Sequence, residues 1–266
     1  MASVRDIIAA LDGAYPQWLA EDWDAVGLTC GRLESKVDTV LLAVDPLPQI
    51  VDEAVACGAQ LIVTHHPLLL RGVHGVPATN AKGEVITRCI ENGIALFSAH
   101  TNADHACPGV SDALAQALGL VDLRPLVPDS RDALLGTGRI GALVSPMTLE
   151  DFGALVARSL PATAHGVRIA GDLGGSVRTV AVCGGAGDSF LESAARAADV
   201  YVTSDLRHHR AQDHLVDGGC ALIDVAHWAS EWPWLWQAAS VIGGTVRTVV
   251  STTPTDPWAA HLGSPS

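Results

Sequence analysis

Residues 40–67, VLLAVDPLPQIVDEAVACGAQLIVTHHP, carry the clearest indication of the fold class. Two short aliphatic runs, VLLAVD and LIVTHH, flank a segment with helical spacing from about Pro48 to Ala56. Aliphatic runs without polar alternation are typical of strands covered on both faces, as in a parallel sheet flanked by helices. The stretch therefore predicts a βαβ unit, and such units bind ligands at the C-terminal ends of their strands.

The same alternation of strand and helix signals extends outward along the chain. A first helix is predicted from Val4, with Ser3 and Asp6 placed as a capping box and Gly13 at its end. Further elements are predicted at helix 80–92, strand 94–100, helix 111–119, strand 139–144, a helix opened by 148–151, strands 167–171 and 179–185, helix 188–198, strand 199–205, helix 208–217, strand 221–227, helix 229–241 and strand 245–250.

A break in this pattern separates two halves of the chain. Residues 121–138 lose hydrophobic periodicity and gain Pro, Gly and charge, which predicts a loop or a domain crossover. We therefore expect an α/β protein of two lobes, with mostly parallel or mixed sheets flanked by helices. Residues 1–125 would form the first lobe and residues 126–266 the second, whose last part would pack back on the first lobe.

The composition restricts the class of protein. With 266 residues, of which 48% are hydrophobic, the chain can bury a large core. Its net charge of −13 argues against a nucleic-acid surface or an anionic-membrane surface, because both need basic patches. The six cysteines are scattered, no run approaches the roughly 20 apolar residues of a membrane span, and the N-terminus lacks a signal-peptide pattern. We therefore expect a cytoplasmic protein with reduced thiols and no membrane partner.

Two adjacent histidines follow the second strand of the βαβ unit. In an ideal strand His65 and His66 would point to opposite faces of the sheet. Pro67 suits a strand end and biases His66 away from helical geometry, so both imidazoles can turn toward one place. An HH pair alone is equally consistent with surface or core histidines, so partners elsewhere in the chain must support a shared site.

Two further clusters pair a histidine with an acid four residues later. His100 ends a predicted strand and precedes Asp104 in a Gly- and Pro-containing loop, SAHTNADHACPGVSD. His227 ends another strand and precedes Glu231 in DVAHWASE; if a helix starts at once, the two lie on one face. Each pair alone is more often a solvated contact. Three such clusters at strand ends together suit one or two divalent transition ions better than Mg²⁺ or Ca²⁺.

Other signals are weaker. His209, in SDLRHHRAQDH, would be an additional ligand, a proton shuttle, an anion contact near Arg207 or a solvated residue at a helix start. The tryptophans between residues 228 and 236 favour core or subunit-interface packing over a pocket. The glycines of CGGAGDS (183–189) resemble a phosphate-binding turn, but the stretch lacks GxGxxG spacing and the lysine of a P-loop.

Seven motifs stand in order along the chain: EDWDAVGL (21–28), THHPLLL (64–70), AHTNAD (99–104), PGVSDALAQALGL (108–120), VAVCGGAGDS (180–189), DVYVTSDLRHH (199–209) and DVAHWASE (224–231). Together they resemble the GTP cyclohydrolase 1 type 2 homologue family, also called Nif-three-like. The resemblance covers about residues 4–250. It implies a two-domain α/β protein that assembles as a toroidal hexamer and holds a dinuclear metal centre facing a central cavity.

The resemblance also implies roles for the clustered residues. Five of them would hold two divalent transition-metal ions per chain: His65, His66, Asp104, His227 and Glu231. Asp104 would share one ion with His66. His227 would share the other with His65, and Glu231 would bridge the two. Imidazole and carboxylate suit Zn, Fe, Mn, Co and Ni alike, so the sequence leaves the metal open.

Two hypotheses of function follow. The first is a metal-dependent hydrolase of a small molecule, nucleotides among the candidates, with His100 or His209 as proton donors. The family name implies GTP cyclohydrolase activity, but the chain shows no motif that reads guanine or binds a triphosphate. The second is a metal-binding regulatory or interaction protein without turnover. DNA binding by the ring is a third idea, against which the acidic balance argues.

Overall fold

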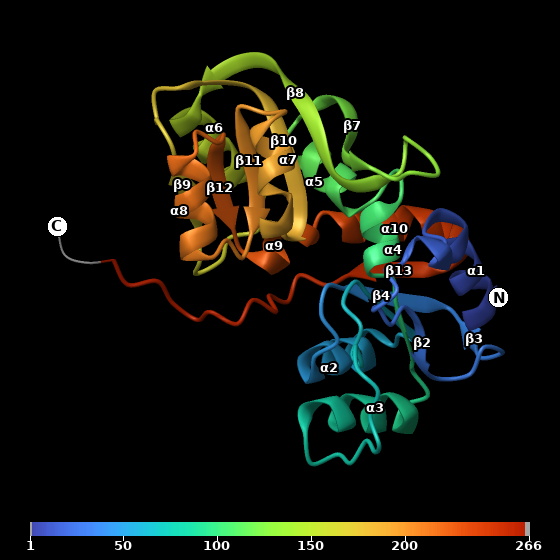
Figure 1. Ribbon diagram of the computed structural model, residues 1–266. Coiled ribbons are helices and arrows are strands. Elements are labelled where there is room, and N and C mark those ends of the chain that lie inside the picture. The colour runs from blue at the N-terminus through green and yellow to red at the C-terminus, as the bar shows by residue number, and fades with distance from the viewer. Residues whose placement is uncertain (1, 264–266) are drawn as a thin grey trace. The chain divides into compact units, whose positions relative to one another are not determined.

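The computed structural model describes residues 2–263, which divide into two compact units (Figure 1). The first unit contains residues 2–106 and 235–255, and the second contains residues 107–234 and 256–263. Each unit is built on one main sheet with helices against it, so the α/β class expected from the sequence is confirmed. The limits of independently folding domains, expected at residue 125, stay a prediction.

In the described part of the first unit, five strands form the main sheet in the order β13-β4-β5-β6-β2. The first four are parallel, and β2 pairs antiparallel with β6 at one edge. Their bounds are β2 Gly27–Cys30, β4 Thr39–Ala43, β5 Leu61–Thr64, β6 Ala95–Ser98 and β13 Arg247–Val250. Because Thr64 of β5 lies opposite Ser98 of β6, the two parallel strands end side by side, and the chain leaves the sheet at the same C-terminal end in both.

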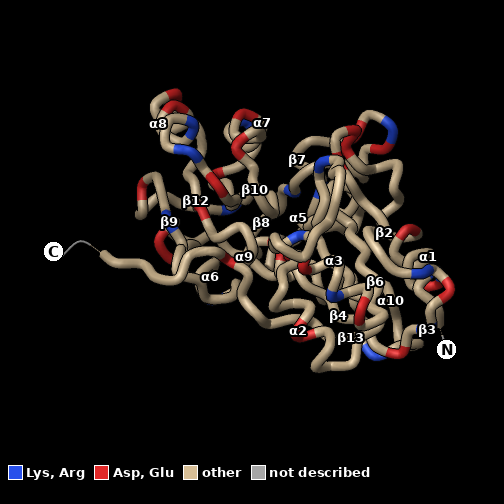
Figure 2. The backbone as a smooth tube through the Cα atoms, turned by 90° about the horizontal axis from the view of Figure 1, so that it is seen from below, with Lys and Arg blue, Asp and Glu red and all other residues tan. Residues whose placement is uncertain are grey.

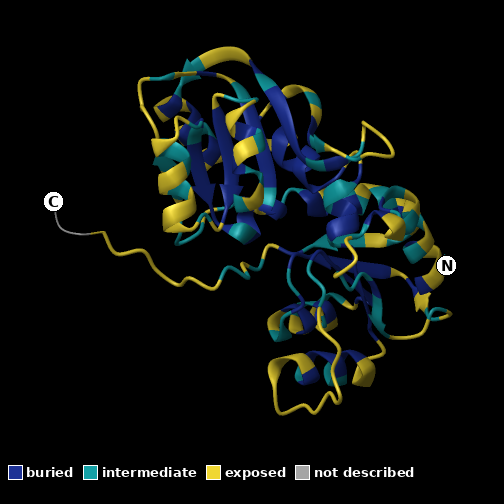
Figure 3. Cartoon of the chain, viewed as in Figure 1, coloured by how far each residue is buried: buried dark blue, intermediate teal, exposed yellow. Residues whose placement is uncertain are grey.

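Helices α2 (Pro48–Cys57) and α3 (Ala81–Glu91) share a core with this sheet. Ile50 of α2 and Val85 of α3 pack in one cluster with Leu41 and other strand residues. Figure 3 shows the strands buried while these helices keep exposed outer faces. The unit also contains α1 (Val4–Ala14), η1 (Gln17–Leu19), α4 (Thr101–His105), most of α10 (Trp234–Ile242), η3 (Gly243–Thr245) and the two-stranded sheet of β1 (Ala2–Ser3) and β3 (Lys36–Val37).

The predicted start of α1 is confirmed. The Ser3 hydroxyl accepts a hydrogen bond from the Asp6 backbone N–H at 3.3 Å. The Asp6 carboxylate in turn accepts one from the Ser3 backbone N–H at 2.8 Å. Two of the helix's unpaired N-terminal N–H groups are thereby satisfied, which fixes where the helix begins.

Within residues 107–234, six described strands form the sheet of the second unit in the order β7-β8-β10-β11-β12-β9. The central strands β10, β11 and β12 are parallel. Strand β8 pairs antiparallel with β10, β9 pairs antiparallel with β12, and β7 pairs antiparallel with β8 at the edge. The strand bounds are β7 Val121–Pro128, β8 Gly136–Thr148, β9 Val167–Ala170, β10 Ser176–Ala186, β11 Val200–Ser204 and β12 Ala221–Val225. The helices are α5 Val110–Ala117, α6 Leu149–Ser159, η2 Asp188–Phe190, α7 Leu191–Ala195, α8 His208–Val216 and α9 His227–Glu231.

The loop expected at residues 121–138 is wrong at both of its ends. Residues 121–128 form β7, an antiparallel edge strand paired with β8, and β8 itself begins at Gly136. Half of the residues of β7 are exposed and only two are buried, so β7 lacks the apolar alternation by which strands are recognised. An edge strand also tolerates Pro125 and Pro128, because a proline without an N–H costs no bond on the open side. Both features made the strand resemble a loop in sequence.

Three other elements differ from expectation. Residues 101–105 form α4 rather than part of a loop. The single helix expected over 229–241 is two helices, α9 and α10, and Pro233 lies between them, where its ring disfavours a continuous helix. The helix expected over 188–198 is shortened to η2 and α7.

Figure 2 shows acidic residues distributed over both units and interspersed with the fewer Lys and Arg residues. The negative charge is therefore spread along the chain rather than confined to one element. Among the described residues, no helix combines the length and the hydropathy that crossing a membrane requires.

Candidate metal centre

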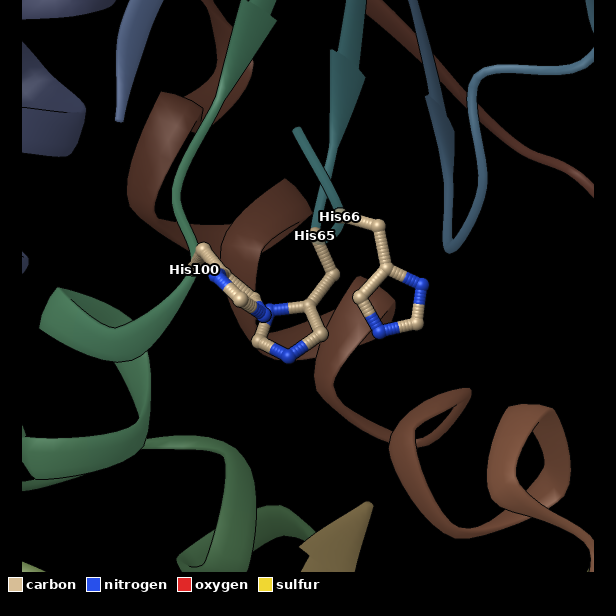
Figure 4. Close-up of side chains that lie close together, drawn as sticks. All are labelled: His65, His66 and His100. Atoms are coloured by element: carbon tan, nitrogen blue, oxygen red, sulfur yellow. The ribbon is translucent and has the colours of Figure 1, made fainter. Parts of the chain in front are cut away.

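Three histidines of the first unit lie together at the ends of neighbouring parallel strands. His65 and His66 follow β5, and His100 follows β6 (Figure 4). Their ring centroids lie 5.1 to 5.5 Å apart, and each ring offers a nitrogen within 4.8 Å of the others. The adjacent histidines therefore do turn toward one place.

The strand end explains how His65 and His66 share a face. After Thr64 the chain leaves regular pairing, and the Thr64 hydroxyl donates to the His66 carbonyl at 2.8 Å. This contact closes a local turn, which places both rings beyond the C-terminal end of β5. The same hydroxyl hydrogen-bonds the Ser98 hydroxyl at 2.9 Å, which ties the turn to the end of β6.

Hydrogen bonds to Nδ1 orient the first two rings. His65 Nδ1 lies 3.0 Å from the Ala99 carbonyl oxygen; since a carbonyl can only accept, this nitrogen carries the proton. His66 Nδ1 lies 2.7 Å from Asp45 Oδ1, a contact in which an ionised carboxylate likewise accepts. Both rings therefore present the lone pair of Nε2, which is how histidines bind metals when an acceptor holds the other nitrogen.

Asp24 holds His100 in the same manner. The Asp24 side chain is fully buried, and its Oδ1 lies 2.8 Å from His100 Nδ1. Burial by itself raises the pKa of this carboxyl, but hydrogen bonds from His100 and Thr101 outweigh burial and hold the pKa well below its usual range. Asp24 is therefore an ionised acceptor at neutral pH, and His100 also presents Nε2.

Asp104 lies one helical turn beyond His100, on α4. Its Oδ1 is 3.7 Å from His65 Nε2, and its side chain is about one quarter exposed. This distance is too long for a direct hydrogen bond and leaves room for a cation between the two atoms. The sharing of one ion by Asp104 and His66 stays a prediction.

In the second unit, His227 and Glu231 lie at the junction of β12 and α9. Because α9 begins at His227, the two residues share one face, and His227 Nε2 lies 3.0 Å from Glu231 Oε1. On the other side of the ring, Nδ1 lies 2.6 Å from Oδ2 of Asp205, which follows β11. The expected one-face arrangement of the HxxxE pair is therefore confirmed.

Two carboxylates make His227 a cation in the metal-free protein. The charge of Glu231 is the main cause, and together with the Asp205 contact it outweighs burial and raises the pKa of His227 to about 11. The hydrogen bond from His227 lowers the pKa of Asp205 in turn. A proton thus occupies the position between an imidazole nitrogen and a buried carboxylate where a metal ion can replace it.

Gly185, near the end of β10, lies close to the His227 and Glu231 side chains. Gly185 has φ +69°, and a Cβ at this position would lie 2.5 Å from Glu231 Oε1 and 3.2 Å from His227 Nε2. The Gly185 backbone N–H donates to Ser230 Oγ at 2.9 Å, which fixes the turn against α9. The glycines that resemble a phosphate-binding turn in the sequence thus make room for the His227 and Glu231 side chains.

His209 stands apart from these contacts. It lies on the exposed first turn of α8, where its ring centroid is 5.0 Å from that of His208. The described contacts of this ring thus involve the adjacent histidine, and a catalytic role for His209 stays a prediction.

Sequence reasoning missed the three carboxylates that orient the rings, namely Asp24, Asp45 and Asp205. Two of them had a signal, because Asp45 follows β4 and Asp205 follows β11, and site residues gather at the ends of parallel strands. Asp24 is 76 residues from His100 and precedes β2, so the spacing gave no hint of their contact.

The donors of each unit fit divalent transition ions. The first unit offers three imidazole nitrogens with set tautomers and a carboxylate nearby. The second offers an imidazole and the nearly buried carboxylate of Glu231, which is 3% exposed. Mixed nitrogen and oxygen donors of this kind suit Zn, Fe, Mn, Co or Ni better than Mg²⁺ or Ca²⁺. The residues present therefore support metal binding.

Comparisons with known proteins give a consistent match over nearly the whole chain. A family model described as Duf34/NIF3 (NGG1p interacting factor 3) matches residues 2–257. A "GTP cyclohydrolase 1 type 2 homolog" from Streptomyces coelicolor is 49% identical over 99% of this chain and 96% of its own length. One from Mycobacterium tuberculosis is 38% identical over 96% of this chain and 97% of its own. The crystal structure of a Bacillus cereus protein related to NIF3 has a TM-score of 0.87 at 27% identity, covering 97% of this chain and 99% of that one.

Proposed function

The chain belongs to the Duf34/NIF3 family, and we propose that it is a metal-dependent hydrolase that holds two divalent transition-metal ions. The observation that carries the proposal is that the three proposed ligand histidines, His65, His66 and His227, each have Nδ1 held by an acceptor. Hydrogen bonds that fix both the tautomer and the orientation of histidines in this way are characteristic of metal ligands.

In this proposal the ions are held by residues of three strand ends: His65, His66, Asp104, His227 and Glu231. Divalent ions so held polarise a carbonyl or phosphoryl oxygen and make water a stronger nucleophile at neutral pH. His100 would not bind an ion. Since ionised Asp24 holds its Nδ1–H, His100 would accept a proton at Nε2 during attack and return it to the leaving group.

The substrate we propose is a small molecule, with nucleotides as the first candidates. The curated relatives are named homologs of GTP cyclohydrolase 1 type 2, and GTP is therefore one compound to test. The reaction class rests on the donor set rather than on that name, because imidazole and carboxylate donors of this kind hold the ions that activate water.

The test couples metal analysis to a substrate screen. Purified protein should contain about two ions per chain, and His65→Ala should lower this number. His74→Ala is the matched control, because His74 lies exposed in a loop of the same unit and should leave the metal content unchanged. Hydrolysis of any nucleotide or phosphoester should disappear in Glu231→Ala. Metal-replete protein that is inert across the panel would instead support a regulatory metal-binding protein, and metal-free protein would refute the proposal.

We also propose that the protein assembles as a ring-shaped hexamer, as the resemblance to the family implies. Large apolar side chains remain exposed on single chains, among them Trp18, Trp236 and Val144. Exposed apolar surface of this kind is typical of subunit contacts. Multi-angle light scattering at micromolar concentration should give the mass of six chains; the mass of one chain would contradict the proposal.

A further inference from the structure

Trp23 is exposed beside the histidines of the first unit. The residue keeps 58% of its surface accessible, yet its ring centroid lies 6.0 Å from that of His100, with an angle of 80° between the ring planes. Exposing this much indole surface to water is unfavourable, and an exposed aromatic residue next to a candidate site suggests that a ligand covers it.

The backbone that carries Trp23 is held rigidly although the side chain is exposed. The Asp24 N–H donates to the Glu21 carbonyl at 3.0 Å, which closes a tight turn with Trp23 inside it. The Glu21 N–H donates to Thr101 Oγ1 at 3.0 Å, and Asp24 Oδ2 accepts from the Thr101 N–H at the same distance. Both ends of the turn are thus fixed to the start of α4.

We propose that Trp23 is a stacking platform for a planar heteroaromatic ring of the substrate. This inference rests on the proposed function, because it names the class of compound that binds beside the His65, His66 and His100 cluster. A rigid aromatic face loses little conformational entropy when a flat ring covers it, and base–aromatic stacking tolerates many ring types.

The neighbouring chemistry favours a flat ring over the other partners of an indole. A cationic group would be repelled by metal ions held at the adjacent imidazoles. An aliphatic group would cover the indole but would gain nothing from its π face. The planes of the Trp23 and His100 rings meet at 80° with their centroids 6.0 Å apart, so a ring stacked on Trp23 would lie beside His100.

The test measures binding rather than turnover, so that it stays separate from the test of hydrolysis. Metal-loaded protein is titrated by calorimetry with guanosine, adenosine and cytidine, and with ribose 5-phosphate as a probe without an aromatic ring. The variants are Trp23→Ala and Trp23→Phe. Trp258→Ala is the matched control, because Trp258 is 67% exposed in the C-terminal segment. Metal content and light scattering of each variant establish that it is folded and correctly assembled.

Trp23→Ala should weaken binding of all three nucleosides by roughly 5- to 150-fold, the range found when a single stacking aromatic is removed. Trp23→Phe should keep affinity within a few-fold, and Trp258→Ala should match the wild type. Binding of ribose 5-phosphate should not change in any variant. The inference is overturned if Trp23→Ala binds nucleosides as tightly as the wild type, or if the wild type binds none at millimolar concentration. It is also overturned if the variant lowers only the assembled mass, because Trp23 would then be a subunit contact.

Discussion

Replacing Gly185 by Ala tests whether the pair His227 and Glu231 holds a metal ion. The added Cβ would lie 2.5 Å from Glu231 Oε1 and 3.2 Å from His227 Nε2. Ordinary contact begins near 3.4 Å, so the carboxylate oxygen would have to withdraw by about 0.9 Å. The substitution therefore displaces a proposed ligand atom without removing any donor.

Two effects of the substitution can be separated by magnitude. Alanine at φ +69° costs about 1 kcal/mol of folding free energy, because its Cβ crowds the backbone in the left-handed region. A metal ligand displaced by nearly 1 Å should cost more, and disturbing the groups that orient ligands weakens metal binding by about 10- to 100-fold. The stability loss is expected in metal-free protein, and the affinity loss appears only when metal is present.

Gly166→Ala is the matched control for this experiment. Gly166 lies in the same unit at φ +67°, and a Cβ there would meet nothing within 4 Å. Chemical denaturation in chelator should show the cost of the left-handed backbone for both variants, and any extra loss in Gly185→Ala measures the clash with Glu231 in the metal-free protein. Dialysis against increasing chelator, followed by elemental analysis, should then show metal loss only from Gly185→Ala. Equal metal retention by the two variants would refute the placement of an ion at Glu231.

Three further predictions concern the proposed ligands and the thiols. Glu231→Gln should weaken both ions together, by tenfold to several hundredfold, whereas Asp104→Asn should keep about one ion per chain after identical dialysis. Loss of one ion or neither from Glu231→Gln would disprove bridging. Because the pKa of His227 is raised to about 11, metal binding must displace its proton, and the affinity for the metal should fall as pH falls from 9 to 6. Calorimetry in buffers of different ionisation enthalpy should detect at least one proton released on metal binding. Alkylation should modify the exposed Cys107 first, whereas Cys220 should react slowly because burial raises the pKa of its thiol to about 11. The metal content should stay unchanged, and metal loss on alkylation would contradict this.

The parts of the site that follow from local pattern could be predicted from the sequence. The βαβ pattern places residues 61–66 and 94–100 on neighbouring parallel strands, so His65, His66 and His100 were expected at one edge of the sheet. The i,i+4 spacing of His227 and Glu231 required only that a helix begin at once, and α9 begins at His227. Both inferences use the spacing of residues along the chain, which can be read from a short stretch of sequence.

The parts that depend on tertiary contacts could not be predicted in this way. Asp24 reaches His100 across 76 residues, and Asp45 reaches His66 across 21. Edge strand β7 is similar, because its pairing with β8 rather than its own hydrophobicity makes it a strand. In each case the deciding interaction joins segments whose separation leaves no periodic signal.

The acceptors on Nδ1 give the candidate ligands a common physical basis. A neutral imidazole carries one N–H and one lone pair, so an acceptor that binds Nδ1–H leaves Nε2 as the coordinating atom. For His65 the acceptor is the Ala99 carbonyl, and for His66 it is the Asp45 carboxylate. The carboxylate makes the imidazole more basic than the carbonyl does, so His66 should be the stronger donor to a metal ion. Because both rings are oriented during folding, an ion that binds them loses little further conformational entropy from the protein.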